Sequence, residues 1–450
     1  MAQLRAPNFK SSLISPAIRK EMAAQDPAHP QPIPVILVLV ESNKPEDGIE
    51  HSKQVVKKFL SEKHYDIRES DFYLFARLLP ADIEELATWK NWIHRIWRDE
   101  TTYSHLLVST QAIKAPACWR TFEARGKGIT WAVMDTGIKS DHPHLANCID
   151  LTLSKNFSNS TVLEDKNGHG THVAGIIAGM ARAKTDGAPC KAATFVEDDD
   201  NPEVVELDGL PSGVAPAATL INVKVLDDDG TGASSNAILA LEYLRKLNQA
   251  SRKIRVDGVN MSLGYPFDPK WYGCGHSPLC EEVTRAVDSG LIVVISCGNS
   301  GYGTTKLDTG QDVPTWIALS ITDPANAEGA IAVGSVHKSK PHTFGVSYFS
   351  SKGPTGDGRQ KPDLVAPGEK VISCSIQIDK GYEYEERSGT SMAAPHVSGA
   401  AAAFLSAHPE FRGDPAAVKD IFMKTATDLG RNHAFQGAGL VDLMRAITSV

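Results

Sequence analysis

This sequence has few cysteines, no cluster of basic residues and no apolar stretch long enough to cross a bilayer. Seven cysteines in 450 residues are too few for a disulfide-rich scaffold, and an odd number leaves at least one thiol unpaired within the chain. Cys274 and Cys280 flank a short loop and could pair in an oxidising compartment, whereas no spacing resembles a zinc site. The net charge of -8 and the lack of a basic cluster give no sign of a nucleic-acid-binding surface, and the longest apolar run, residues 34–40, is far shorter than a membrane span. We therefore expect neither a nucleic acid nor a membrane as a partner.

Residues 1–30 contain scattered Lys and Arg but no apolar core followed by a small-residue cleavage site. The sequence thus has no recognisable secretory signal. We expect a cytoplasmic protein, and the alternative is a secreted protein whose leader lies outside this sequence.

The N-terminal part of the chain predicts a polar arm followed by a small folded unit. Residues 1–32 are polar and have several prolines near their end, so they are interpreted as a flexible arm. Residues 33–103 predict a compact α+β unit of ferredoxin-like character, which on its own is typical of a small binding module. Its expected elements are strand 33–41, helix 48–63, strand 72–79, helix 81–92 and strand 93–99.

Residues 104–450 predict one α/β domain. Buried-strand runs separated by helical patterns indicate a mostly parallel sheet with helices on both faces. In such sheets function gathers at the carboxyl ends of the strands, and Asp135 directly follows the first run. Residues 183–210 are acidic and turn-rich and are expected to form a surface insertion. The strand runs are 129–134, 220–225, 259–263, 291–296 and 331–336.

Three short motifs carry the chemistry. Asp135 stands at a strand end before Thr-Gly, His169 stands between two glycines at a helix start, and Ser391 follows Gly-Thr before an apolar helix. A serine hydroxyl needs a base to take its proton, imidazole is suited to that near neutral pH, and a carboxylate orients the imidazole. Each residue alone would also suit a turn or a helix cap. His172 would suit a metal only with a third ligand, so it and His396 are interpreted as packing residues.

In this chain order the motifs resemble the signatures of the subtilisin-like serine proteases (subtilases), over roughly residues 105–448. The resemblance implies an α/β, subtilisin-like three-layer domain with a mostly parallel sheet. It also implies a serine endopeptidase that hydrolyses peptide bonds in polypeptide substrates through an acyl-enzyme on Ser391, with Asp135 and His169 completing the catalytic triad. Asn299, in a Gly-flanked turn after a strand, matches the amide of the family's oxyanion hole. The chemistry requires no cofactor.

The same resemblance implies two edges between which an extended substrate pairs as an added strand. Leu263 and the segment Ser296, Cys297 and Gly298 are expected to line the pocket for the residue before the scissile bond, with Thr322 near its floor. We expect this pocket to prefer an apolar or aromatic side chain. Cys297 replaces the alanine that is commonest in the family and predicts sensitivity to mercurials. The residues expected at the two edges are Gly230, Thr231, Gly232, Ser262, Leu263 and Gly264.

Many secreted subtilases hold a structural calcium ion with an aspartate soon after the catalytic one. In this sequence the corresponding residue is His144, a poor ligand for a hard cation. The usual strong calcium site is therefore not expected, and the acidic residues of 183–210 are an alternative place for such an ion.

By its position and its α+β pattern, the unit 33–103 resembles the family's propeptide, an intramolecular chaperone and inhibitor. The resemblance implies a self-inhibited zymogen that autoprocesses, with Tyr103–Ser104 as the candidate bond. Two other hypotheses stay open. In one, the unit remains bound and the protein is a latent binding scaffold; in the other, the acyl-enzyme transfers its acyl group to an amine instead of water.

Overall fold

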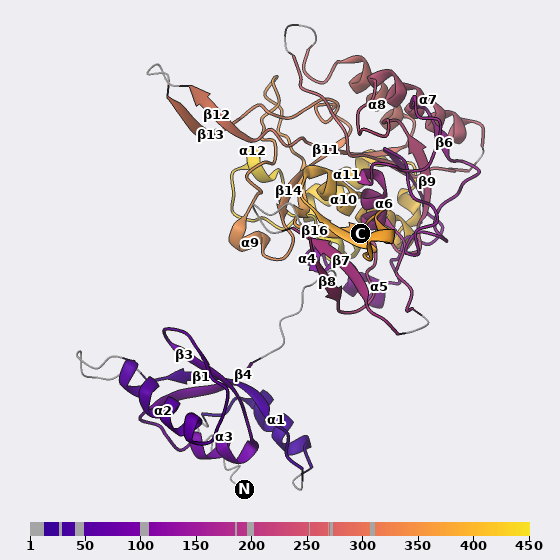
Figure 1. The fold of residues 1–450 in the computed structure, drawn as a ribbon. Coiled ribbons are helices and arrows are strands. Elements are labelled where there is room, and N and C mark those ends of the chain that lie inside the picture. The colour runs from indigo at the N-terminus through magenta and orange to yellow at the C-terminus, as the bar shows by residue number, and fades with distance from the viewer. Residues whose placement is uncertain are drawn as a thin grey trace, which may run out of the picture. The chain divides into compact units, whose positions relative to one another are not determined.

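The structure is a computed structural model of the chain. Its contacts divide the chain into two units, Met1–Tyr103 and Ser104–Val450, which we call the small unit and the large unit (Figure 1). Each is described by itself. The residues that the structure describes are 13–26, 29–40, 49–99, 108–184, 187–195, 202–251, 253–268, 270, 273–306 and 311–450.

The small unit is built on a four-stranded antiparallel sheet with the order β2-β3-β1-β4. Burial alternates along β1, so Ile33, Val35 and Leu37 all face one core, which α2 and α3 complete. The five expected strands and helices occur in the expected order between residues 33 and 98, and a short strand, β2, is present in addition. The elements are α1 (Pro16–Ala24), β1 (Ile33–Leu39), α2 (Glu50–Glu62), β2 (Arg68–Glu69), β3 (Tyr73–Leu78), α3 (Pro80–Leu86) and β4 (Ile93–Arg98).

Two expectations for the small unit are wrong. Residues 13–26, interpreted as part of a flexible arm, contain α1, and Ile14 and Ile18 are buried in the core. The backbone N–H of Ser15 donates to the Ile96 carbonyl at 3.0 Å, which fastens this segment to β4. The helix α3 ends at Leu86, earlier than expected, because the chain then makes tight backbone turns before β4.

The large unit contains a seven-stranded sheet with the order β15-β14-β11-β10-β5-β9-β6. All its neighbouring strands run parallel, which confirms the predicted sheet, and all five strand runs expected from the sequence are present. The strands are β5 (Thr130–Asp135), β6 (Lys155–Asn156), β9 (Thr219–Lys224), β10 (Gly258–Met261), β11 (Ile292–Ser296), β14 (Ile331–His337) and β15 (Leu364–Glu369).

Helices cover both faces of this sheet and give the predicted three layers (Figure 1). Successive residues of β5 face opposite cores, Val133 one and Met134 the other. The first core includes α6 (His169–Ile177), α10 (Thr390–Ala407), α11 (Pro415–Thr425) and α13 (Leu443–Thr448), and the second includes α7 (Ser234–Gln249) and α8 (Pro278–Asp288). The shorter helices are α4 (Val108–Ala112), α5 (Ala115–Thr121), α9 (Pro341–Phe344) and α12 (His433–Gln436), with 3-10 turns at Ile378–Lys380 and Pro409–Phe411.

The segment 183–210, expected to be a surface loop, contains two strands instead. β7 (Cys190–Thr194) and β8 (Glu203–Leu207) pair as an antiparallel hairpin, and Ala192 and Ala193 on β7 are buried. β7 also pairs with β17 (Tyr384–Arg387), which pairs with β16 (Val371–Cys374). The loop expectation is therefore wrong for the two strands, and the acidic residues 196–201 lie outside the described residues.

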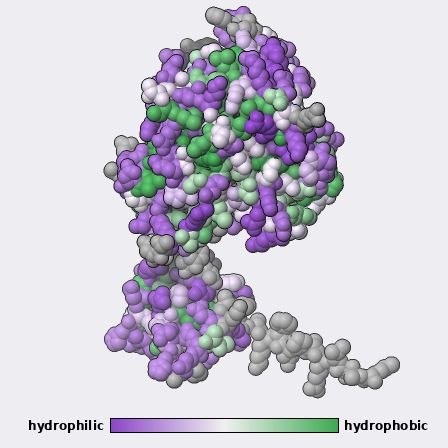
Figure 2. Space-filling view, turned by 90° about the vertical axis from the view of Figure 1, so that its right-hand side faces the viewer, coloured by the Kyte–Doolittle hydropathy of each residue, from purple (hydrophilic) through white to green (hydrophobic). Residues whose placement is uncertain are grey.

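The surface of the large unit is mixed. On the face seen in Figure 2, small groups of apolar residues lie among polar ones. A further antiparallel hairpin, β12 (Tyr302–Lys306) and β13 (Asp312–Trp316), projects from the unit (Figure 1). None of the helices in the described ranges combines the length and the apolar character that a bilayer crossing requires. All seven cysteines are free thiols, so the pairing suggested for Cys274 and Cys280 is not formed.

Candidate active site

Asp135 and His169 meet where strand β5 ends. Asp135 is the last residue of β5 and is fully buried, and His169 is the first residue of α6. His169 Nδ1 lies 2.7 Å from Asp135 Oδ1. Gly170 permits this approach, because a Cβ there would lie 2.1 Å from the carbonyl oxygen of Gly137. The structure therefore brings two of the three predicted catalytic residues into direct contact.

The Asp135 carboxylate controls the protonation of His169. Burial lowers the pKa of His169, but the charge and the hydrogen bond of Asp135 raise it and outweigh burial, so the pKa lies above the usual 6.5. When Nδ1 donates its proton to Asp135, Nε2 is the atom left to accept one. Asp135 Oδ1 also accepts the backbone N–H of Thr136 at 2.8 Å, which fixes the carboxylate.

Ser391 is the second residue of α10, and Ser262 holds it in place. The Ser391 hydroxyl donates to the Ser262 carbonyl oxygen at 3.3 Å, and the Ser262 hydroxyl donates to the Ser391 carbonyl oxygen at 2.9 Å. The second bond is available because Pro395, four residues on, has no N–H to offer that carbonyl. This exchange fastens the helix start to the segment that follows β10.

Asn299 lies beside the same helix start. Its Oδ1 accepts the backbone N–H of Thr390 at 2.9 Å and the Thr390 hydroxyl at 3.0 Å. These bonds occupy the amide oxygen and leave Nδ2 as the donor group of this side chain. Gly298 precedes it with φ +101, a left-handed conformation that turns the chain sharply after β11.

One cleft of about 600 Å³ contains these groups, and His169, Asn299 and Ser391 all line it. Thr322 lines it as well. Sequence reasoning missed an apolar part formed by Leu226, Ala237 and Leu279. The substrate-binding residues expected from the sequence that line the cleft are Gly230, Thr231, Gly232, Ser262, Leu263, Gly264, Ser296 and Gly298.

Cys297 is the expected pocket residue that the structure places elsewhere. Its side chain is fully buried in the core that contains α7 and α8, while its neighbours Ser296 and Gly298 line the cleft. Burial raises the pKa of the Cys297 thiol to about 12. A buried, protonated thiol reacts slowly, so the structure does not support the expected sensitivity to mercurials.

The other histidines singled out by the sequence are packed in the interior. His172 Nε2 lies 3.0 Å from the Glu385 carbonyl oxygen and His396 Nδ1 lies 2.8 Å from that of Met392. His144 is buried between the Tyr384 hydroxyl and the Ala178 carbonyl, and burial lowers its pKa to about 3. A neutral ring so enclosed does not fit a calcium ion. Across the described ranges, no group of three or more His, Cys, Asp or Glu side chains could hold a metal ion.

Sequence reasoning missed Asp165, which organises the segment before His169. Its Oδ1 accepts the Thr136 hydroxyl at 2.9 Å and the Gly168 N–H at 2.9 Å, and its Oδ2 accepts the Thr171 hydroxyl at 2.6 Å. The pattern Asp-x-x-Gly-His was the available signal. The candidate cleavage site Tyr103–Ser104 lies outside the described residues.

Comparisons with known proteins find relatives of this chain. The model of the subtilase family matches residues 126–440. Serine protease AprX of Bacillus subtilis (strain 168) is 30% identical over 390 residues, which are 83% of this chain and 78% of the relative. Subtilisin E of the same organism is 34% identical over 336 residues (74% and 69%). Its major intracellular serine protease is 34% identical over 306 residues (67% and 75%).

Proposed function

The chain belongs to the subtilase family of subtilisin-like serine endopeptidases, and we propose that Ser391, His169 and Asp135 are its catalytic triad. One observation carries this assignment. The Asp135–His169 contact of 2.7 Å lies beside a cleft that His169, Ser391 and Asn299 line together. The chemistry of this family uses no cofactor, so these side chains supply every group that the reaction needs.

In the first step the Ser391 hydroxyl turns from the Ser262 carbonyl toward His169 and attacks the substrate carbonyl carbon. His169 Nε2 takes the hydroxyl proton, and the Asp135 carboxylate stabilises the imidazolium that forms. The same proton then passes to the leaving amine as the peptide bond breaks. Water attacks the resulting ester by the same route and releases the second product.

Asn299 and the start of α10 stabilise the charge that develops on the substrate oxygen. The amide oxygen of Asn299 is occupied by Thr390, so Nδ2 donates to the oxyanion together with the Ser391 backbone N–H. The positive end of the α10 dipole adds to this effect.

A polypeptide substrate binds extended between Gly230–Gly232 and Ser262–Gly264, which line the cleft. The residue before the scissile bond enters the part lined by Ser296, Gly298 and Thr322, and an apolar or aromatic side chain suits it. The apolar side chains of Leu226, Ala237 and Leu279 favour an apolar residue further upstream in the substrate.

The small unit acts as an inhibitor of the large unit until the enzyme cuts the bond near Tyr103–Ser104. Support comes from its own core and its separate antiparallel sheet, which allow it to fold and persist as a distinct body. A template also has a clear role for the large unit, whose parallel sheet requires many contacts between distant parts of the chain.

Intact mass after expression tests the proposal, with the natural sequence and Ser391→Ala side by side. We expect the natural protein to lose roughly its first hundred residues and the Ser391→Ala protein to stay at full length. Loss of the same fragment from both proteins would show cleavage by another protease and contradict autoprocessing.

A fluorophosphonate probe tests the triad separately from autoprocessing. We expect covalent labelling at Ser391 in the natural protein and none in Ser391→Ala. Labelling of a full-length natural protein would support the triad and remove the self-processing step. No labelling of a folded natural protein would contradict the catalytic assignment itself.

A further inference from the structure

Lys224 is the last residue of β9 and pairs in register with Asp135, the last residue of β5. Its side chain is fully buried, with no exposed surface at the ammonium end. A buried ammonium is tolerated only when its three N–H donors find acceptors and a negative charge lies close. Its acceptors therefore indicate which parts of the chain this charge holds together.

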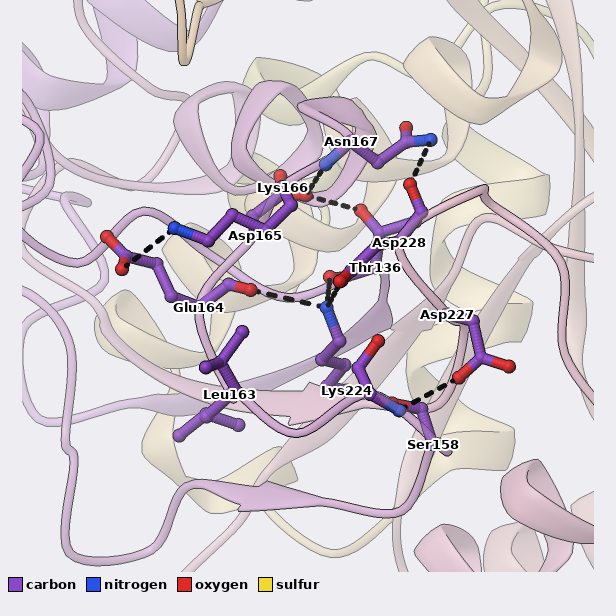
Figure 3. Close-up of polar contacts among 12 residues, drawn as sticks. Thr136, Ser158, Leu163, Glu164, Asp165, Lys166, Asn167, Lys224, Asp227 and Asp228 are labelled. Atoms are coloured by element: carbon purple, nitrogen blue, oxygen red, sulfur yellow. Dashed lines mark hydrogen bonds and ion pairs between the residues drawn. The ribbon is translucent and has the colours of Figure 1, made fainter.

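Each of the three acceptors belongs to a different segment (Figure 3). Lys224 Nζ donates to the Thr136 carbonyl oxygen at 2.7 Å, to the Glu164 carbonyl oxygen at 3.2 Å and to Asp228 Oδ1 at 2.7 Å. Asp228 supplies the balancing charge, and the bond to Lys224 lowers the pKa of its carboxyl group. One amine thus joins three separate stretches of backbone.

Each of these segments leads to a part of the proposed site. Thr136 directly follows Asp135, Glu164 lies in the segment that leads to His169, and Asp228 lies two residues before Gly230 at the edge of the cleft. A displacement of the ammonium would therefore also displace the backbone next to Asp135, the segment that leads to His169 and the segment that leads to the Gly230–Gly232 edge.

Neighbouring side chains form further hydrogen bonds between the same segments. Asn222, two residues before Lys224 and on the same face of β9, donates to the Leu163 carbonyl at 3.2 Å. Asp227 Oδ1 accepts the Asn159 N–H at 2.7 Å, and Asn167 Nδ2 donates to the Asp228 carbonyl oxygen at 3.4 Å. The segment before His169 is therefore tied to the cleft edge at several points (Figure 3).

We propose that Lys224 is a positioning residue whose buried ammonium fixes the Thr136 backbone for the Asp135–His169 pair and, through Asp228, holds the Gly230–Gly232 edge for extended substrates. This inference rests on the proposed function. It assigns two separable effects to one amine: the Thr136 bond supports the turnover step, and the Asp228 bond supports binding of the substrate chain.

Two substrates separate these effects in the protein as it is isolated after expression of the full chain. p-Nitrophenyl acetate is too short to reach the Gly230–Gly232 edge and reports only on the triad. A tetrapeptide p-nitroanilide with phenylalanine before the scissile bond occupies both edges. Labelling by a fluorophosphonate first establishes that the natural protein has a working nucleophile.

Asp228→Ala removes the contact toward the edge and with it the charge that balances Lys224, so urea unfolding first establishes that this variant is folded. We expect its KM for the tetrapeptide to rise about tenfold, the loss typical of one charge-assisted hydrogen bond, with a much smaller fall in kcat than in Lys224→Met, because the bond from Lys224 Nζ to the Thr136 carbonyl remains. Lys224→Met removes both the bond to Thr136 and the bond to Asp228. We expect the same rise in KM and, in addition, a fall in kcat of about 10²-fold on both substrates, because the triad is misplaced.

Lys361→Met is the matched control. Lys361 is another buried lysine, bonded to Asp363 and to the Ala330 carbonyl, and none of the three residues lines the cleft. Lys361→Met should lower the free energy of unfolding without the selective rise in KM or the fall in kcat expected of the other two variants. An unchanged tetrapeptide KM in Asp228→Ala overturns the inference even if Lys224→Met does not fold. Failure of the natural protein to label overturns the proposed function, and this inference with it.

Discussion

The two units bury their polar groups in different ways. In the described part of the small unit, the buried carboxylate is Asp82, and it bonds to Lys63 at 2.6 Å and to the Tyr65 hydroxyl. Burial alone would raise the pKa of Asp82, but these two partners outweigh burial and the net shift is downward. Asp82 is thus satisfied locally, and its bonds tie one helix to the loop beside it.

Two buried charges of the large unit lie at the ends of adjacent parallel strands. Asp135 and Lys224 end adjacent strands, and each is bonded to groups from distant parts of the chain. One Asp135 oxygen, Oδ2, has no hydrogen-bond partner among the described residues. Asp82 in the small unit thus bonds to neighbouring side chains, whereas Asp135 and Lys224 in the large unit connect the segments that carry the proposed site. A carboxylate removed from each unit should therefore have very different consequences.

Asp135→Asn should slow the enzyme more than any other substitution proposed for the two units, apart from loss of Ser391 or His169. The amide would favour the wrong tautomer of His169, and we expect kcat/KM to fall by about 10⁴-fold, the order known for Asp→Asn in the Ser-His-Asp triad of a chymotrypsin-type protease. The rate of Ser391 labelling by a fluorophosphonate measures it, with circular dichroism to establish that the fold is intact.

Asp82→Asn is the counterpart in the small unit. It should lower the free energy of unfolding of that unit by about 1–3 kcal/mol, because Lys63 loses its charged partner, without slowing the labelling of Ser391. Comparable losses of labelling in both variants would contradict the contrast between the two carboxylates.

Truncating one buried side chain in each unit compares the contributions of the two cores to stability. Leu37 in β1 and Phe404 in α10 are both fully buried. Leu37→Ala should cost about 2–5 kcal/mol and Phe404→Ala about 3–5 kcal/mol, each in its own unit. If the small unit inhibits the large one, Leu37→Ala should also speed labelling of Ser391, while Phe404→Ala should not.

Calorimetry with fluorescence as a second probe measures these losses. Two transitions, each shifted by one variant, would agree with units that unfold separately. A single transition shifted equally by both variants would show that the two units unfold together. That result would contradict the prediction that each truncation lowers the stability of its own unit.

The strands and the catalytic motifs were predictable because their signals are local. The five strand runs are continuous apolar segments, and Asp135, His169 and Ser391 each stand in a short motif. The strand β7 was not predictable, because Cys190–Thr194 is short and contains small residues and a lysine. Its pairing with β17 joins residues nearly two hundred positions apart.

Side-chain direction and long-range bonds explain the remaining errors. Cys297 faces the core because successive residues at the end of an extended strand point to opposite sides, so its two neighbours reach the cleft and it does not. Lys224 carries no sequence signal, since two of its acceptors are backbone carbonyls of segments sixty or more residues away. Ile14 and Ile18 are too few to reveal a packed helix within a polar stretch.

The last prediction compares lysines of the two units and concerns only the change of stability with pH. Lys63 is half-exposed beside Asp82 and Glu85, which raise its pKa. Lys352 is buried, donates to the Tyr348 and Ser350 carbonyls and lies over the Trp316 ring, and no carboxylate pairs with it in the described ranges. Burial lowers the pKa of Lys352 to about 8. The two lysines should therefore contribute to stability with opposite dependence on pH.

For Lys352 the folded state binds its proton less tightly than the unfolded state, so the charge destabilises the fold fully below pH 8. The penalty disappears as pH rises from 8 to 10.5, and the difference in pKa corresponds to about 3 kcal/mol. The free energy of unfolding of the natural protein minus that of Lys352→Met should rise by this amount over that range. Urea unfolding at several pH values measures the difference and cancels the titration of the cysteines and tyrosines that both proteins share.

For Lys63→Met the same difference in the free energy of unfolding should fall above pH 10.5, because the stability given by a raised pKa is lost there. A difference for Lys352→Met that stays flat with pH would mean that the ammonium is already balanced by a charge in the folded state, and the large unit would then bury this charge as the small unit does.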